Sequence, residues 1–278
     1  MCGSCATVGS TSAACAACAG TVVSGPPQSL VWARAPLVAA AAERAMLAKV
    51  LRWPNETGMM FSQPAFRLRE VRAACRNTRM PLLQALSLRR HHIKARNPGK
   101  PDRYLRLGTS AQKLAAATVF EAVVQAHLDA LGVAYLTERD QRAAHGPWRG
   151  PGFKSPPTPD FVLATPLVLD ADIGGASTSG ACDGALCHWI EVKHFYGAGT
   201  IPSDGKSACG KIPSKSQQYL EYFGPGAYVF AYGCSADLAA SLAPGCVVLD
   251  DAVLAPRMAP LFAQLRTWCA APGGEILP

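Results

Sequence analysis

The sequence has little charge and no long hydrophobic run. Of its 278 residues, 17% are Asp, Glu, Lys or Arg and 49% are apolar. This balance excludes an intrinsically disordered chain, because disorder requires low hydrophobicity and high net charge. Arg34, Glu43 and Arg44 bracket the apolar run 37–42, which is far shorter than the roughly 20 residues of a membrane-spanning helix. We therefore expect a folded protein without a membrane segment.

Acidic residues are scarce, and the resulting positive charge is concentrated in one region. The chain has 27 Lys and Arg against 19 Asp and Glu, a net charge of +8. Residues 67–106 hold twelve Lys and Arg against two acids, or +10, which leaves −2 for the rest. Such a local positive field favours a surface that meets phosphates, and the alternative is a solvated helical face. The predicted nucleic-acid-binding residues are Arg89, Arg90, Lys94, Arg96, Lys211 and Lys215.

A secretory signal pattern is also missing, although the chain has eleven cysteines. The first Lys or Arg is Arg34, so no charged segment precedes an apolar one near the start. We expect a reducing compartment, nucleus or cytoplasm, with most cysteines acting as small apolar residues. Paired thiolates at the Cys2–Cys5 and Cys15–Cys18 spacing are one possible zinc site. The Ala- and Ser-rich surroundings favour a low-complexity tail instead.

Changes in composition divide the chain into three parts. We predict a flexible leader over 1–30, a basic helical N-terminal region over 31–106 and an α/β domain over 107–278. Periodicity and proline positions predict helices at 36–51, 64–75 and 81–94. In the third part, helices are expected at 109–131, 214–223 and 258–269, strands at 133–136, 160–169, 188–195, 227–232 and 246–249, and a mobile loop at 197–213. This order predicts a mixed sheet flanked by helices.

One acidic residue interrupts the apolar stripe of the helix at 109–131. Glu121 lies between Phe120 and Ala122, at a position that helical spacing directs towards the core. A buried carboxylate costs several kcal/mol unless it is paired or bound to a metal. Glu121 is therefore a candidate functional residue.

Two acids and a lysine are expected to converge on neighbouring strands. Asp160 begins one strand, and Glu191 and Lys193 lie on one face of its partner because strand side chains alternate. Carboxylate oxygens suit Mg²⁺ or Mn²⁺. Lys193 beside the ion is placed to position a water that attacks a phosphodiester. We predict Asp160, Glu191, Lys193 and Glu121 as catalytic, with the three acids as metal ligands, and the alternative is a solvated strand carrying a surface ion pair.

Three segments resemble a known family. They resemble the TPD-motif family within the PD-(D/E)xK restriction-endonuclease-like superfamily, and they read Thr158-Pro-Asp-Phe161, Trp189-Ile-Glu-Val-Lys193 and Phe223-Gly-Pro-Gly226. In addition, residues 135–142 resemble the family's segment just before its Thr-Pro-Asp triplet. The family's animal member is the codanin-interacting nuclease. One departure is Lys215, which stands where the family usually has glutamine, before the tyrosine matched by Tyr219.

The resemblance implies a metal-dependent nuclease fold, related to archaeal Holliday junction resolvases. It places Asp160, Glu191 and Lys193 at active-site positions and Glu121 as the helix acid. We expect a Mg²⁺- or Mn²⁺-dependent nuclease acting on DNA or structured nucleic acid. The alternative is a nucleic-acid-binding or adaptor protein that keeps the fold without turnover. A codanin-like protein partner is implied by the resemblance alone.

Overall fold

The computed structural model describes residues 28–30, 32–50, 82–96, 110–145, 156–169, 185–203, 205 and 207–269. The leader up to residue 27 and the predicted helix at 64–75 lie outside this set, as does the boundary predicted at 106/107. None of the helices in these described ranges combines the length and the hydrophobicity that a membrane span requires.

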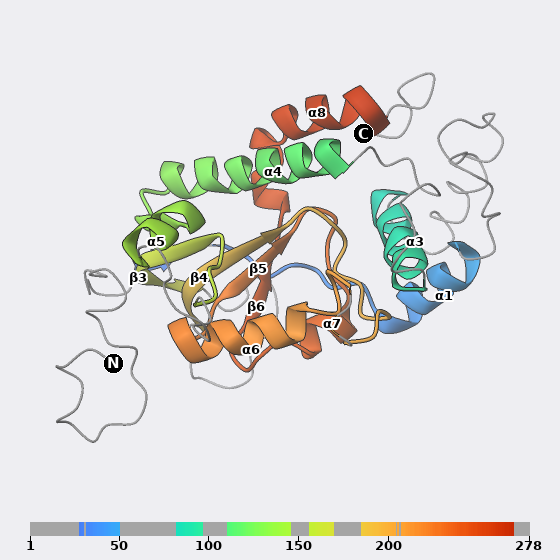
Figure 1. Cartoon of the computed structure of the whole chain (residues 1–278), viewed down its shortest axis with the longest axis horizontal. Coiled ribbons are helices and arrows are strands. Elements are labelled where there is room, and N and C mark those ends of the chain that lie inside the picture. Colours follow the sequence, from blue (N-terminus) through green and yellow to red (C-terminus); the bar gives the residue numbers. More distant parts are fainter. Residues whose placement is uncertain are drawn as a thin grey trace, which may run out of the picture.

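A six-stranded mixed sheet forms the centre of the fold (Figure 1). Its order is β1 (Gln28–Leu30), β3 (Phe161–Leu169), β4 (Ala185–Lys193), β5 (Ala227–Phe230) and β6 (Val247–Leu249), and β2 (Tyr135–Thr137) also pairs with β3. The β2–β3 and β3–β4 pairs are antiparallel, and the others are parallel. The β3–β4 register shifts between Val162 and Leu167, where Pro166 has no N–H to donate. The mixed sheet predicted from sequence is confirmed.

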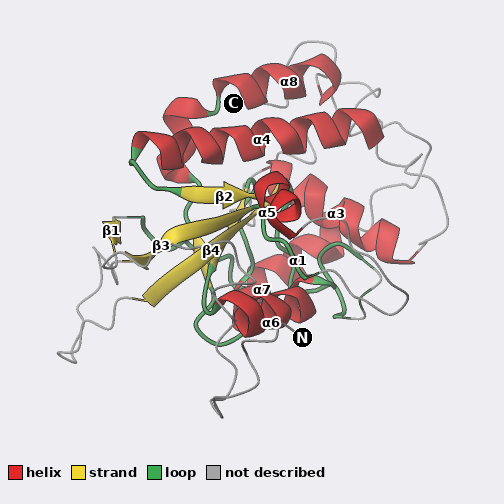
Figure 2. Cartoon of the chain, turned by 60° about the vertical axis from the view of Figure 1, so that its left-hand side comes forward, coloured by secondary structure: helices red, strands yellow, loops and turns green. Residues whose placement is uncertain are grey.

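Helices cover both faces of the sheet (Figure 2). One face carries α4 (Ser110–Ala130) and α8 (Ala259–Cys269), and the other carries α6 (Ile212–Phe223) and α7 (Ala236–Ala240). Because strand side chains alternate, Ile190 and Val192 join the core beneath α4, and Trp189 packs with Tyr219 of α6. The same alternation puts Glu191 on the α6 face.

Most elements of the C-terminal part were predicted, with small differences in their ends. Helices α4, α6 and α8 and strands β2 to β6 agree with the predictions within a few residues. Three elements were not predicted: α5 (Glu138–His145), α7 and the 3₁₀ helix η1 (Ala252–Arg257). Each is short or lacks an apolar stripe, so periodicity does not reveal it.

The described N-terminal segments pack onto this α/β fold. Strand β1 pairs with β3, and Trp32 lies in the core beneath α4. The predicted leader was therefore wrong for 28–30, which form an edge strand. Helices α1 (Ala40–Val50) and α3 (Leu82–Arg96), at the side of the sheet in Figure 1, pack against each other.

The segment predicted as a mobile loop is packed instead. Ala198, Ile201 and Cys209 are buried in one cluster with Met46 of α1 and Leu88 of α3. These apolar side chains leave water when they pack against the two helices, which favours the packed arrangement. This cluster attaches the two helices to the end of the sheet.

The Phe223–Gly226 turn directs the chain from α6 into β5. Gly224 has φ +87°, a conformation that L side chains rarely adopt. A Cβ at Gly226 would lie 2.2 Å from the Trp189 indole, so only glycine fits there. Trp189 Nε1 also donates a hydrogen bond to the Gly224 carbonyl at 2.9 Å. The two glycines thus hold α6 and β5 against the strand that carries Glu191.

Candidate active site

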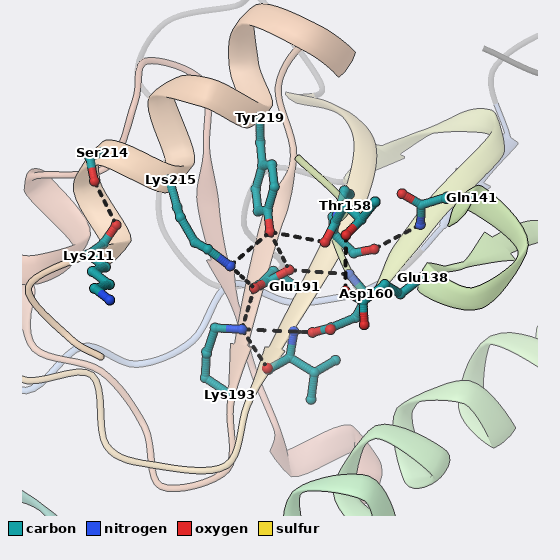
Figure 3. Close-up of polar contacts among 12 residues, drawn as sticks. Glu138, Gln141, Thr158, Asp160, Glu191, Lys193, Lys211, Ser214, Lys215 and Tyr219 are labelled. Atoms are coloured by element: carbon teal, nitrogen blue, oxygen red, sulfur yellow. Dashed lines mark hydrogen bonds and ion pairs between the residues drawn. The ribbon is translucent and has the colours of Figure 1, made fainter. Parts of the chain in front are cut away.

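The register of β3 and β4 brings the predicted acids together. Phe161 pairs with Ile190, so Asp160, which precedes β3, lies beside Glu191. The Asp160 N–H donates to Glu191 Oε2 at 3.2 Å, and the Val192 N–H donates to Asp160 Oδ2 at 2.6 Å. Each carboxylate therefore accepts a hydrogen bond from the backbone of the neighbouring segment (Figure 3).

Lys193 lies between the two carboxylates. Its ammonium contacts Glu191 Oε1, lies 3.9 Å from Asp160 Oδ2 and donates to the Val192 carbonyl at 3.1 Å. Burial acts to lower the pKa of Lys193, and the negative charges of Glu191 and Asp160 outweigh it, so the pKa is raised. Lys193 is thus a fixed positive charge in this site.

Helix α6 contributes a tyrosine and a second lysine. The Tyr219 hydroxyl lies 3.0 Å from Glu191 Oε2 and 3.3 Å from the Thr158 carbonyl. Lys215 Nζ lies 3.7 Å from Glu191 Oε1. Both side chains point from α6 towards Glu191 in Figure 3. The Glu191 carboxylate, only 3% exposed, is therefore surrounded by donors.

Negative charge in the site is not fully balanced by these lysines. Burial, followed by repulsion from Glu191, raises the pKa of Asp160 to about 7 even with Lys193 nearby. The pKa of Glu121 is also raised, first by burial and then by Glu138, with a smaller contribution from Glu191. The carboxylates are close enough to repel one another, an arrangement that favours binding of a cation.

Helix α5 holds the Thr158-Pro159-Asp160 triplet in place. Thr158 Oγ1 donates to Glu138 Oε1 at 3.0 Å, and the Gln141 amide donates to the Pro159 carbonyl at 2.8 Å. The Glu138 N–H donates to the Asp160 carbonyl at 3.1 Å. Each residue of the triplet thus has a partner on α5.

The sequence analysis placed Glu138 and Gln141 in a family-like segment and matched Tyr219 to the family's tyrosine, but it assigned none of the three a role. A signal for α5 was present in Thr137 and Asp140, which form a capping box: the Thr137 N–H donates to Asp140 Oδ2 at 3.0 Å and the Asp140 N–H to Thr137 Oγ1 at 3.3 Å. No local pattern marks Tyr219, because its role depends on how α6 lies over the sheet.

The arrangement fits a divalent ion held by two carboxylates. Across the described ranges, no three His, Cys, Asp or Glu side chains are grouped so as to hold a metal ion. Glu121 is not grouped with Asp160 and Glu191 there, so its predicted role as a metal ligand, directly or through water, stays a prediction. Mg²⁺ is commonly bound by one or two carboxylates, with waters and substrate phosphate completing the octahedron. Asp160 and Glu191 supply that number.

The predicted nucleic-acid-binding residues do not share one environment. Arg89 is 1% exposed, and burial lowers its pKa, so its guanidinium does not face a ligand in this conformation. Arg90 is partly buried, and the side chains of Lys94 and Arg96 lie outside the described set. Lys215 is exposed in the first turn of α6, and Lys211 is exposed immediately before that helix. The exposure of these two lysines is compatible with the predicted phosphate contacts, which stay a prediction.

The site lies within a segment that matches a known family. The family described as "Protein of unknown function TPD sequence-motif" matches residues 99–252. The chain belongs to the TPD sequence-motif family. No curated protein and no solved structure matches it.

The family segment contains the whole described site. Glu121, Glu138, Asp160, Glu191 and Tyr219 all lie between 99 and 252. The described helices α1 and α3 precede it, and α8 follows it. The TPD segment therefore includes both α5, which holds the triplet, and α6, which holds Glu191.

Proposed function

We propose that this TPD-family chain is a divalent-metal-dependent nuclease with a restriction-endonuclease-like catalytic core. The observation that carries the proposal is the convergence of Asp160, Glu191 and Lys193 at the β3–β4 pair, with one ammonium beside both carboxylates. Two acids and a lysine in this order, on adjacent strands, are the groups needed to bind a cation and a phosphodiester together. The excess of carboxylates supports cation binding.

Each side chain has a distinct part in the proposed reaction. A divalent ion held by Asp160 and Glu191 supplies stabilisation of the charge that builds up on the phosphate. Lys193, held as an ammonium by the two carboxylates, donates hydrogen bonds to the attacking water or the phosphate oxygens. Tyr219 fixes the Glu191 carboxylate, and Glu138 fixes Thr158. Lys211 and Lys215 contact neighbouring phosphates.

Cleavage assays on the purified full-length chain test this proposal. Single-stranded, double-stranded and four-way-junction DNA and a structured RNA are incubated with Mn²⁺, with Mg²⁺ and with EDTA. We expect metal-dependent cleavage that falls by roughly 100-fold or more in Glu191→Gln, because the ion that stabilises charge on the phosphate loses a charged ligand. The matched control is Glu221→Gln. Glu221 lies exposed on α6 and contacts only Gln217 among its described hydrogen bonds.

The results separate the nuclease from a binding protein. Cleavage that survives Glu191→Gln would refute the assigned site. If wild type binds DNA but takes up no Mn²⁺ in calorimetry and cleaves none of the substrates, the chain is a binding or adaptor protein instead.

A further inference from the structure

Lys215 is placed differently from the other site lysine. It lies in the first turn of α6, with Nζ 3.7 Å from Glu191 Oε1 and 3.4 Å from the Tyr219 hydroxyl. The same nitrogen lies 5.7 Å from the centre of the Tyr219 ring. The stem therefore runs along the tyrosine and delivers the ammonium to the carboxylate, as Figure 3 shows.

Lys193 and Lys215 share a single carboxylate oxygen, Glu191 Oε1. Lys193 is 19% exposed and is also held by Asp160 and the Val192 carbonyl. Lys215 is 48% exposed, and its contacts are longer. Long contacts at an exposed side chain are weak, because solvent screens them and the chain loses rotamer entropy. Lys215 is thus the more easily detached of the two ammonium groups.

A divalent ion on Glu191 would act against the Lys215 contact. Two cations that meet the same carboxylate repel each other, and Lys193 is held by further groups whereas Lys215 is free to rotate into solvent. A lysine released at the first turn of α6, beside the triplet and Tyr219, remains within reach of a phosphate bound at the site. Its flexible four-carbon stem suits such an exchange.

We propose that Lys215 is an exchangeable counter-ion of Glu191. It neutralises Glu191 when no divalent ion is bound, and when the ion binds it transfers its charge to a phosphate of the nucleic acid. Lys215 thereby couples binding of the divalent ion to binding of the nucleic acid. This inference rests on the proposed nuclease function and adds to it a residue that senses whether the site is loaded.

Calorimetry with Mn²⁺ alone tests the first half, using Lys215→Gln and the control Lys211→Gln. Lys211 immediately precedes the same helix and is exposed, and no ion pair joins it to a carboxylate in the described part of the chain. Lys215→Gln should bind Mn²⁺ about fivefold more tightly than wild type, the gain expected from losing one competing ion pair. Lys211→Gln should stay close to wild type. A structural defect would weaken Mn²⁺ binding rather than strengthen it.

Fluorescence anisotropy with a labelled DNA hairpin tests the second half. Ca²⁺ replaces Mn²⁺ to slow cleavage, and each titration is repeated in EDTA. With Ca²⁺, Lys215→Gln should bind the hairpin about fivefold more weakly and lower the slope of log affinity against log salt by about one. In EDTA it should match wild type, because Lys215 is then engaged with Glu191. Any loss in Lys211→Gln should be equal in both conditions.

Lys215→Arg keeps the charge and should restore both wild-type affinities. Unchanged or weaker Mn²⁺ binding by a folded Lys215→Gln protein overturns the counter-ion role, and so does a loss of hairpin affinity that is equal with and without Ca²⁺. These outcomes leave the proposed nuclease intact if wild type still takes up Mn²⁺ and cleaves. A wild type that does neither overturns both proposals.

Discussion

Glu43 and Glu191 are both buried carboxylates, and their neighbours differ. Glu43, on α1 and 0% exposed, accepts hydrogen bonds from neutral donors: the Tyr196 hydroxyl at 3.2 Å, the Gly199 N–H at 3.3 Å, and the Thr200 N–H and hydroxyl at 2.9 and 2.5 Å. Glu191 contacts two ammonium groups and lies beside another acid whose pKa it raises.

The difference separates a structural acid from a candidate functional one. The donors around Glu43 come from the packed segment 196–200, so its bonds attach α1 to the end of the sheet. Glu191 has charged partners on both sides, and neighbouring carboxylates repel it. A carboxylate satisfied by backbone and hydroxyl donors has no need of a ligand. A carboxylate that lies near other carboxylates is stabilised when a cation binds to it.

The largest expected difference between Glu191 and Glu43 is in metal binding, when each is replaced by glutamine. Glu191→Gln should weaken Mn²⁺ binding by roughly 100-fold or more, because a charged ligand becomes a neutral amide. Glu43→Gln should leave Mn²⁺ affinity within about twofold of wild type, because Glu43 lies in the helix junction rather than in the site. Calorimetry measures both. Equal losses at the two positions would erase the distinction between the acids.

Removing the Glu43 carboxylate should lower stability instead. Glu43→Ala leaves the donors of Tyr196 and Thr200 buried without an acceptor, so we expect a loss of about 2 kcal/mol or more in the free energy of unfolding. Urea denaturation followed by circular dichroism measures it, with Glu221→Ala as the exposed control. A loss below that of the control would mean that the junction contributes nothing to folding.

His194 lies between the two regions and should make stability sensitive to acid. Burial, with a smaller contribution from Arg90, lowers the pKa of His194 to about 4, and Tyr232 and Phe120 also contact its ring. The unfolded chain, with a pKa near 6.5, binds the proton more tightly, so stability falls as pH drops below about 6.5. Relative to His194→Gln, wild type should lose roughly 1–2 kcal/mol between pH 7 and pH 5.

Urea titrations of both proteins across this range measure the loss. The glutamine retains a partner for the Tyr232 hydroxyl, so the two stabilities should be similar at pH 7. Parallel pH curves for the two proteins would locate the acid sensitivity elsewhere.

The smallest expected effects come from removing the hydroxyl groups of Tyr196 and Tyr219. Tyr196→Phe removes a contact to Glu43, and Tyr219→Phe removes one to Glu191. Each should cost about 1 kcal/mol of stability, the usual net contribution of one hydrogen bond. Tyr219→Phe alone should also change Mn²⁺ affinity, by a few-fold, because Glu191 loses a positioning contact. Denaturation and calorimetry on the same samples separate the two effects.

Much of the fold and the centre of the site could be predicted from sequence, because both depend on local patterns. Helical spacing located α4, and alternation placed Glu191 and Lys193 on one face of β4. Charge in an otherwise buried strand distinguished the site. The prediction for Arg89 assumed that the basic residues of α3 face phosphates, whereas the helix packs this residue inside.

The sequence by itself determined which strands carry the acids and that Asp160 and Glu191 would be neighbours, because strand periodicity and pairing follow from the order of residues. Tertiary structure alone decided the partners of those acids. Tyr219 and Lys215 reach Glu191 because α6 lies over the sheet, and Glu138 and Gln141 reach the triplet because α5 lies against its backbone. Packing of α1 against residues 196–200 likewise gives Glu43 neutral hydrogen-bond donors and hence a structural role. A side chain's role depends on the charges and donors that folding places around it, and residues distant in the chain supply them.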